Sequence, residues 1–534
     1  MAAPAALRRE LKARAAPPLL LLVAAGALEV TSVRHDSLTF DEPVHYRYGM
    51  NVLEGDSTRF DDSKMPVTAL NALPAFVGAR LRPGPLRDRL TRVETGRLVT
   101  IAFALLVGAQ VFRWSRALYG PAAGLWSLFL YALDPNLIAH SRLITTDAYV
   151  AGMVLLALYA FWGFLNRGGW TRALASALLL ALAQLAKYTS MYLYPVFILI
   201  VLVREGPAWW RRARAGDWRS LGLSTLAFAR YAALFAVISL WIVNAGFLFN
   251  RTGVRLSEYR FRSALFQRLQ AALPAEHLRV PVPYPFLEGL DWVWMGDRAG
   301  VGYTYLLGEL RGGEGFKGYF LYATLFKAPL PLLLAIAAAL IVCAVRWRGL
   351  RLRDDEVFLL LPVAFFTVYF NFVSHAHWGI RIFLVVFPLL HVLAGVLLRD
   401  WPALGARGRA AVAALAVWLV GSVLSYYPHY IPYFNEIVWD RKQSYRYLSD
   451  SNVDWGQGEW YLARWREQHP EARVEPREPR AGRIVVGVSK LTGVFNPPRY
   501  RWLRENFRPV DHVAYAYLVF DVPEERLRKI GVLE

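Results

Sequence analysis

The 534-residue sequence contains a single cysteine and lacks the common motifs for nucleotides and zinc. Because Cys343 is the only cysteine and lies within an apolar run, an intrachain disulfide and a metal cluster held by thiolates are both excluded. No glycine-rich phosphate loop, Walker lysine motif or His-Glu-x-x-His motif occurs, which argues against energy from ATP. No internal repeat, heptad pattern or low-complexity run occurs either, which argues against a transporter built from repeats.

Long apolar runs dominate the chain, which is 56% hydrophobic and only 19% charged. Several runs approach the ~20 residues that span a bilayer core, so the sequence predicts an α-helical polytopic membrane protein. Two short runs joined by Lys187-Tyr188-Thr189 predict a tight hairpin. We predict about 11 transmembrane helices, near residues 17–33, 97–112, 121–139, 148–165, 173–186, 190–203, 225–247, 319–345, 356–374, 380–398 and 410–427.

The formal net charge of +20 would suggest nucleic acid as the partner of a soluble protein. Here the arginines cluster in short gaps between apolar runs, which indicates membrane orientation and no nucleic-acid partner. We therefore expect a plasma-membrane protein with a cytoplasmic N-terminus and an extracytoplasmic C-terminus. The gaps on the inner side contain Arg113, Arg116, Arg167, Arg172, Arg204, Arg211, Arg212, Arg214, Arg219, Arg346, Arg348, Arg351, Arg353, Arg399, Arg407 and Arg409.

Two regions follow from this topology. Residues 1–427 form a transmembrane domain with large outer loops at 34–96 and 248–318. Residues 428–534 form a small extracytoplasmic α/β segment with strand-like runs at Arg483–Val488 and His512–Val522. The first apolar run resembles a signal peptide that could be cleaved near Ala25-Gly26-Ala27, but its length favours an uncleaved first span.

Ionisable side chains gather at the outer ends of several spans, where they are costly unless they are paired or line a wet cavity. Singly, each has an ordinary explanation: Lys187 and Arg381 could extend to the interface, Asp147 could cap the next helix, and the histidines could be loop residues. Jointly they predict one cavity of mixed charge at the outer leaflet. The set is Asp41, Glu42, Lys64, His140, Arg142, Asp147, Lys187, Lys327, His375, His377 and Arg381.

Such a cavity suits a lipid-phosphate-linked substrate, which keeps its chain in the bilayer and presents an anionic headgroup at the interface. Lysine and arginine can hold the phosphate and stabilise the charge that grows on it as it leaves. A carboxylate opposite them can accept a proton from an incoming hydroxyl. With no ATP motif in the chain, the donor is expected to be pre-activated.

These residues lie in motifs that resemble the phospholipid-carrier-dependent glycosyltransferases of the GT-C superfamily, family 39. That group contains the protein O-mannosyltransferases and the lipid A aminoarabinose transferases. The stretches that carry the resemblance, in chain order, are Phe40-Asp41-Glu42, Lys64-Met65-Pro66-Val67, Ala139-His140-Ser141-Arg142 with Thr145-Thr146-Asp147, Lys187-Tyr188-Thr189, Lys327-Ala328-Pro329-Leu330-Pro331, Gly379-Ile380-Arg381 with Pro388, and Asp450-Ser451-Asn452-Val453-Asp454-Trp455-Gly456-Gln457.

The resemblance implies a GT-C-type bundle, a polyprenyl- or dolichyl-phosphate sugar donor, a hydroxyl-bearing acceptor and an inverting single displacement. It implies Asp41 as the catalytic base, and we assign Glu42 and Asp147 to orienting acceptor or sugar. It also makes Lys64, Arg142, Lys187 and Arg381 the candidate phosphate contacts, with His140, Lys327, His375 and His377 as further substrate contacts. Two departures from the family motifs, Met65 and Ile382, weaken the assignment of the neighbouring Lys64 and Arg381.

Two alternatives remain. A transporter or flippase of lipid-linked sugars would use the same charges without a base. A scaffold subunit of an envelope complex would neither cleave nor translocate the donor, and the many charges at the outer ends argue against it. The sequence identifies no certain cofactor and leaves the need for a divalent cation open, which Asp41, Glu42 and Asp147 could hold through oxygen ligands. Asp450, Asn452 and Asp454 alternate as in a calcium loop, but Trp455 stands where such a loop needs glycine, which disfavours calcium.

Overall fold

The computed structural model describes residues 5–56, 58, 64–300, 302–347, 355–495, 497 and 499–532. The inner-gap residues Arg348, Arg351 and Arg353 lie outside the described residues. Helices occur at all eleven predicted spans, which confirms an α-helical polytopic architecture. Within the described residues, seven helical stretches are long and apolar enough to cross a membrane: Ala16–Val33, Thr95–Tyr119, Asp147–Arg167, Tyr188–Arg214, Trp218–Gly246, Ile380–Leu398 and Ala406–Leu424.

Four shorter apolar helices complete the set: Pro66–Gly78, Pro121–Ala132, Leu330–Val345 and Val357–Phe372. The first of these lies in the outer loop 34–96 and was not among the predicted spans. Two predicted spans are broken in the middle. Span 121–139 divides into α6 (Pro121–Ala132) and α7 (Pro135–Ser141), because Asp134 caps the second helix, and span 319–345 divides at Ala328-Pro329 into α14 (Tyr319–Lys327) and α15 (Leu330–Trp347).

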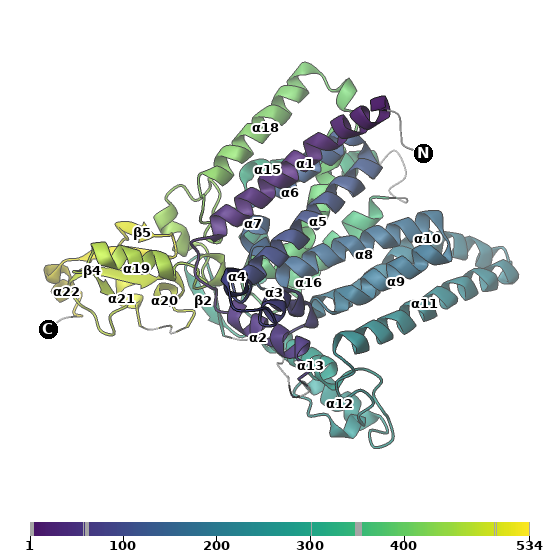
Figure 1. Ribbon diagram of the computed structural model, residues 1–534, viewed down its shortest axis with the longest axis horizontal. Helices are drawn as coiled ribbons and strands as arrows, with labels where there is room; N and C mark the ends of the chain where they lie inside the picture. Colours follow the sequence, from purple (N-terminus) through teal and green to yellow (C-terminus); the bar gives the residue numbers. More distant parts are fainter. Residues whose placement is uncertain are drawn as a thin grey trace.

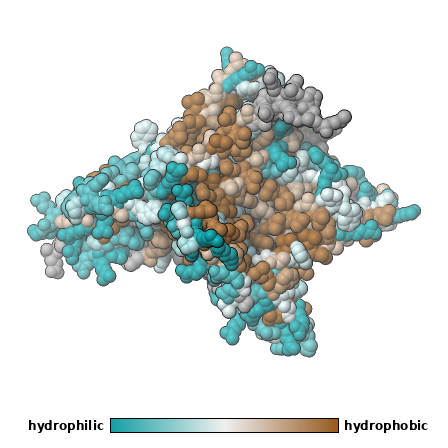
Figure 2. All heavy atoms as spheres, viewed as in Figure 1, coloured by the Kyte–Doolittle hydropathy of each residue, from teal (hydrophilic) through white to brown (hydrophobic). Residues whose placement is uncertain are grey.

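The helices pack as a bundle with α8 (Asp147–Arg167) and α17 (Phe387–Ala394) near its centre. Their apolar side chains face the protein on most sides, whereas α11 (Trp218–Gly246) and α18 (Ala406–Leu424) are largely exposed. Figure 2 shows the result as a broad brown band of apolar side chains between teal polar ends. An apolar surface of this extent indicates burial in lipid. The remaining long helices are α1 (Ala5–Val33), α5 (Thr95–Tyr119), α9 (Trp170–Gln184), α10 (Leu193–Arg214) and α16 (Val357–Phe372).

The large loops form short elements at one end of the bundle, and the start of α1 lies at the other end (Figure 1). Loop 34–96 contains α2 (Glu42–Leu53), α3 (Ala69–Gly78) and α4 (Pro85–Leu90). Loop 248–318 contains α12 (Ala264–Ala272), α13 (Tyr284–Ala299) and the hairpin of β1 (Tyr303–Leu306) with β2 (Glu309–Gly312).

The C-terminal segment is a small α/β unit, as predicted. Its four strands lie in the order β3-β4-β6-β5, with β3 (Arg473–Val474) parallel to β4 (Gly482–Gly487) and the other pairs antiparallel. The strand-like run predicted at 512–522 contains two strands. The chain turns back between β5 (Asp511–Val513) and β6 (Tyr517–Val522), where Ala514 and Tyr515 both have positive φ. The short helices around the sheet are α19 (Glu459–Gln468), α20 (Val488–Thr492), α21 (Arg501–Asn506) and α22 (Glu524–Lys529).

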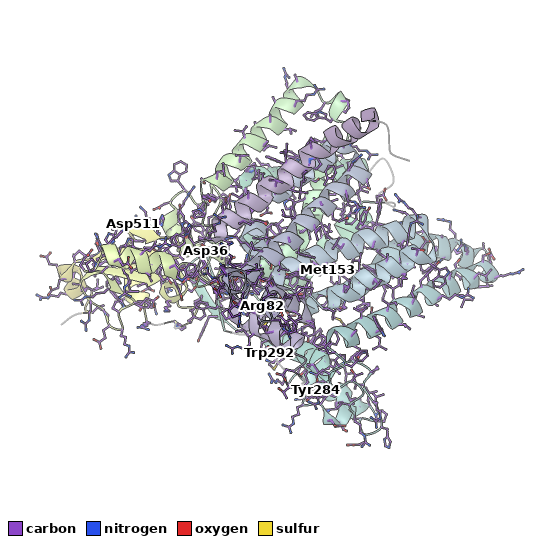
Figure 3. All side chains as sticks on the ribbon, viewed as in Figure 1. Asp36, Arg82, Met153, Tyr284, Trp292 and Asp511 are labelled. Carbon is purple, nitrogen blue, oxygen red and sulfur yellow. The ribbon has the colours of Figure 1, made fainter. Side chains whose placement is uncertain are left out.

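The C-terminal segment is joined to the transmembrane region by backbone hydrogen bonds. The N–H of Ser37 donates to the carbonyl of Gln457 at 3.0 Å, and that of Phe40 donates to the carbonyl of Trp455 at 3.1 Å. Asp36, on the same connecting stretch, lies where the bundle meets the C-terminal segment (Figure 3). The loop that carries Asp41 is therefore held between the two regions.

Candidate active site

A cavity of about 730 Å³ lies at this junction. Its wall combines residues that are far apart in the sequence, from the first outer loop, the starts of α8 and α10, α13, the α16 end and the C-terminal segment. The polar and charged side chains on the wall are Asp41, His45, Lys64, Thr146, Lys187, Thr189, Asp297, Arg381 and Asp450. Aromatic side chains cover much of the remainder, among them Phe40, Tyr192, Phe266, Trp292, Trp378, Trp455 and Phe495.

Arg381 is the central cation of the cavity. Its Nη1 lies 3.1 Å from Oδ2 of Asp41 and 3.4 Å from Oδ2 of Asp147. Its Nε donates to the carbonyl of Trp378 at 3.1 Å, and its guanidinium lies 4.3 Å from the ring centre of Trp455. These contacts hold the guanidinium in one orientation, with part of its donor capacity directed at the cavity.

Lys187 and Asp147 form a second ion pair beside the first. Asp147 is the first residue of α8, where the helix dipole favours a negative charge, but the preceding Thr146 takes the N-cap position. The expectation that Asp147 itself caps this helix is therefore wrong by one residue. Lys187 stands in extended backbone before a short 3-10 turn, at the reversal predicted between the two short spans. Asp147 thus contacts two cations, one of which is partly exposed to the cavity.

Asp41 lies at the N-cap position of α2, and about a third of its side chain is exposed (34%), far more than the other carboxylates it neighbours. His45 follows one helical turn later and also lines the cavity. Burial lowers the pKa of His45 to about 3, with the nearby charges of Lys64 and Lys187 acting in the same direction. A neutral imidazole therefore stands beside Asp41 at neutral pH. The four-residue spacing on a helix was a usable signal for His45, and sequence reasoning missed it.

Glu42 does not line the cavity, although it follows Asp41 directly. It is fully buried, and its two oxygens accept bonds from Nη2 of Arg97 at 2.7 Å and from Nε at 2.8 Å. The backbone N–H groups of Thr39 and Ile144 also donate to it, at 2.8 and 3.0 Å. Because its acceptor sites are occupied by protein donors, the structure favours a positioning role for Glu42 over contact with acceptor or sugar.

Three other predicted contacts lie behind the cavity wall. Arg142 is buried and has Nη2 2.9 Å from Oδ2 of Asp36, whose pKa is raised to about 6 by burial although Arg142 opposes the shift. Lys327 is also buried, and its Nζ donates to the carbonyls of Ile431 and Asn452, both at 2.6 Å. The ring of His140 packs on Trp455, with centroids 5.9 Å apart. The structure does not bring these three side chains into the cavity.

His375 and His377 line a different cavity, of about 470 Å³, between the β1–β2 hairpin and the end of α16. The Nδ1–H of His375 donates to the carbonyl of Arg298 at 2.7 Å, and the ring of His377 stacks on that of Tyr319 with centroids 5.0 Å apart. Burial lowers the pKa of His377 to about 4, so its ring is neutral at physiological pH. The structure therefore separates these two histidines from Asp41 and Arg381.

The three carboxylates proposed for a divalent cation, Asp41, Glu42 and Asp147, all have cationic protein partners in this structure. Among the residues that the structure describes, no group of three His, Cys, Asp or Glu side chains is arranged to hold a metal ion. Glu42 turns toward Arg97, away from Asp41 and Asp147. In the calcium-like loop, Oδ1 of Asn452 accepts from the N–H of Ile380 at 2.9 Å, and Oδ1 of Asp454 accepts from that of Gly456 at 3.3 Å. These oxygens serve protein contacts.

Sequence reasoning also missed a polar chain on the cavity wall. Oδ2 of Asp297 accepts from the hydroxyl of Tyr369, which also contacts the hydroxyl of Tyr192, and Oδ1 accepts from the hydroxyl of Ser374. Asp450, Trp455 and Phe495 reach the cavity from the C-terminal segment. The sequence analysis noted residues 450–457 as a stretch that resembles the family and as a calcium-like pattern, but it did not place Asp450 at the site, because nothing in the sequence indicates which loops the segment contacts.

Comparison with known proteins gives one family match and several structural similarities. Residues 92–241 match the family model described as dolichyl-phosphate-mannose-protein mannosyltransferase, which confirms the resemblance inferred from the motifs. This segment runs from the end of the first outer loop into α11 and contains Asp147 and Lys187. No curated protein sequence matches the chain.

Among solved structures, the chain is similar to ArnT from Cupriavidus metallidurans bound to undecaprenyl phosphate, with 14% identity over 94% of this chain and 97% of that chain and a TM-score of 0.48. It is also similar to the oligosaccharyltransferase of Archaeoglobus fulgidus in the apo form, with 16% identity, a TM-score of 0.48 and coverage of 76% of this chain and 55% of that chain. A complex of the archaeal oligosaccharyltransferase AglB with an inhibitory peptide and a dolichol-phosphate has 15% identity and a TM-score of 0.46, with 85% of this chain and 58% of that chain covered.

Proposed function

We propose that this chain, with its match to a family of lipid-phosphate-dependent mannosyltransferases, is an integral-membrane glycosyltransferase. It moves a sugar from a polyprenyl-phosphate carrier to a hydroxyl acceptor at the outer face of the plasma membrane. The observation that carries the proposal is the position of Arg381, between two carboxylates and on the same cavity as Lys64 and Lys187. This combination offers phosphate contacts and a base within one site.

The cations are suited to the lipid phosphate. Arg381 and Lys187 each have a carboxylate partner in the absence of substrate, so their charges are balanced until a phosphate binds. A phosphate that contacts Arg381 competes with Asp41 for its donors. Asp147 stays paired with Lys187 and keeps both cations in position. As the bond to the sugar breaks, negative charge grows on the phosphate oxygens, and these cations stabilise it.

Asp41 is suited to the general base. Its carboxylate is the partly exposed one, and the departure of Arg381 toward the phosphate leaves it free to accept a proton. The acceptor oxygen forms a bond to the anomeric carbon as the bond between that carbon and the phosphate oxygen breaks. The hydroxyl proton passes to Asp41, and the lipid phosphate leaves with the bonding electrons. A single displacement of this kind inverts the anomeric configuration.

The test is a single-turnover assay with radiolabelled dolichyl-phosphate-mannose in purified, reconstituted protein, with mannose, glucose and arabinose donors compared. Release of dolichyl phosphate with transfer of label marks a glycosyltransferase. Translocation of intact donor without cleavage marks the transporter alternative and overturns the proposal.

The base is tested with Asp41→Asn, which we expect to fold, bind donor and lose turnover by roughly 10²–10⁴-fold. Asp88→Asn is the matched control, because Asp88 is an exposed acid on α4 of the same outer loop. Retained turnover in Asp41→Asn would remove Asp41 as the base. Labelling of an Asp88→Cys variant with a membrane-impermeant thiol reagent on intact cells tests whether the first outer loop faces the outside.

A further inference from the structure

The C-terminal segment supplies part of the cavity wall through Asp450, Trp455 and Phe495. Asp450 is one of the few residues other than glycine with a positive φ, at 58°. This left-handed conformation is disfavoured for residues with a side chain, and Asp and Asn adopt it more readily than most. A backbone outlier on the wall of a substrate cavity suggests that the position of its side chain matters.

Neighbouring contacts hold this conformation in place. Asn452 donates through Nδ2 to the hydroxyl of Tyr319 at 2.9 Å, and its Oδ1 accepts from the N–H of Ile380. Lys327 donates to the carbonyl of Asn452, and the hydroxyl of Ser451 donates to the carbonyl of Trp378 at 2.9 Å. These bonds tie the loop to α14 and to the turn that carries Arg381. Lys327, buried and away from substrate, thus helps to fix the wall of the cavity.

The carboxylate of Asp450 is available to a ligand. It accepts from the backbone N–H of Ser451 and, among the residues that the structure describes, it forms no ion pair. Burial raises the pKa of Asp450, Arg381 opposes this shift, and Asp41 adds to it. The other acids around the cavity differ, because Asp41 and Asp147 contact Arg381 and Asp297 accepts from two hydroxyls.

Asp450 lies on the same cavity wall as Arg381, and this position indicates which part of the substrate Asp450 contacts. This step rests on the proposed function, in which Arg381 holds the lipid phosphate. A sugar is bonded directly to that phosphate, so the surfaces next to Arg381 that do not bind phosphate face the sugar. Trp455 already covers the guanidinium at 4.3 Å, and Phe495 packs edge-on against Phe40 at 6.4 Å. Aromatic walls with a few placed polar groups are typical of sites that orient small ligands.

We propose that Asp450 recognises the transferred sugar of the lipid-linked donor, with its carboxylate accepting hydrogen bonds from sugar hydroxyls. The C-terminal segment is then part of the donor site. Selectivity for the sugar lies in this segment, whereas affinity for the lipid phosphate lies in the transmembrane cations. Hydrogen bonds to a charged acceptor are strong enough for one carboxylate to change donor affinity by an order of magnitude.

The experiment compares two ligands, dolichyl-phosphate-mannose and sugar-free dolichyl phosphate, bound to the full-length protein in nanodiscs. If mannose is not the donor that the wild type turns over, the corresponding glucose or arabinose donor takes its place. Asp450→Asn and Asp450→Gly both accommodate the left-handed backbone, so they change the side chain with little effect on the loop. We expect each variant to bind the donor roughly tenfold more weakly and to bind dolichyl phosphate within about twofold of wild type.

Asp521→Asn is the matched control, because Asp521 is an exposed acid on β6 of the same segment that pairs with Arg483. It should leave both affinities unchanged. Unchanged donor affinity in Asp450→Asn and Asp450→Gly would overturn the proposal, and so would an equal loss for both ligands. If the wild type turns over no donor, the proposed function itself fails. If the wild type turns over a donor and the Asp450 variants bind that donor as tightly as the wild type does, only the assignment of Asp450 to the sugar fails.

Discussion

Two groups of charged side chains lie at the same end of the bundle and differ in what surrounds them. Around the cavity, Arg381 pairs with Asp41 and Lys187 pairs with Asp147, while Asp41, Lys187 and Arg381 remain partly exposed. Behind the wall, the Glu42–Arg97 and Asp36–Arg142 pairs are almost completely buried. The first group has capacity left for a ligand. The ion pairs of the second group connect the first outer loop to α5 and α7.

The comparison shows that charge at a given depth does not identify a substrate contact. Glu42 and Arg97 are charged residues like those of the site, but their role is structural. Arg97 also donates to the carbonyls of Asp36 and Ser37 at 3.0 and 2.7 Å. Replacements in the buried group should therefore lower mainly the stability of the protein, and replacements in the cavity group should lower mainly its activity.

The largest effect should come from Arg97→Ala, which leaves Glu42 buried without its cation. We expect a loss of about 3–5 kcal/mol in the free energy of unfolding, measured by thermal unfolding in detergent. Arg381→Ala should lower stability far less and reduce turnover strongly, because Asp41 is partly exposed and the buried Asp147 keeps Lys187 as its partner. Arg92→Ala, an exposed arginine of the same loop, is the control. Equal loss of stability in the Arg97 and Arg381 variants would remove the distinction between the two groups.

The next effect concerns pH and the buried Asp454 of the C-terminal segment. Burial raises its pKa from 3.8 to about 6 in the folded state, so its contribution to stability is complete below pH 3.8 and is lost as the pH rises through about 6. The wild type should lose up to about 3 kcal/mol over this range through Asp454. Asp454→Asn should flatten the dependence of melting temperature on pH. Some dependence should persist, because the pKa of Asp36 is raised in the same direction.

A third prediction contrasts two lysines. Lys327→Met removes the donor to two buried carbonyls, so we expect a loss of about 1–3 kcal/mol and faster proteolysis of the C-terminal segment. Limited proteolysis followed by mass spectrometry measures the second effect. Lys529→Met, at the end of α22, serves as a distant control. Wild-type protease resistance in Lys327→Met would contradict the tethering role.

Lys187→Met should act on the ligand instead. Loss of one charge-assisted contact predicts roughly tenfold weaker binding of dolichyl phosphate, measured by titration in nanodiscs, with a smaller change in melting temperature. A change confined to melting temperature would assign Lys187 to the buried group.

The smallest effect is expected at the second cavity. His375→Ala should change the KM for donor by less than about twofold, because His375 lines a cavity separate from that of Arg381. Steady-state kinetics with dolichyl-phosphate-mannose measures it. A large rise in the KM for donor would contradict this separation and assign His375 to the donor site.

Much of the candidate site was accessible from the sequence. Asp41, Lys64, Lys187 and Arg381 stand at the ends of apolar runs and in motifs that resemble a known family, and all four line the cavity. Glu42 could not be separated from Asp41 in this way, because neighbouring residues at a helix start point about 100° apart and only packing decides which one faces the cavity. His140, Arg142 and Lys327 were misplaced for the same reason.

The contributions of the C-terminal segment were out of reach. Asp450 and Trp455 follow Asp41 by more than 400 residues, and no local pattern relates them. Likewise, the hairpin at Ala514-Tyr515 depends on the pairing of β5 with β6, which a single apolar run does not reveal.

The sequence by itself determined the membrane-spanning helices and the accumulation of charge at one end of the bundle, because both follow from the cost of placing polar groups in lipid. Only the tertiary structure decided which charges pair inside the protein and which face the cavity. That choice depends on contacts between distant segments, whose energies are set by three-dimensional burial and geometry rather than by neighbours along the chain.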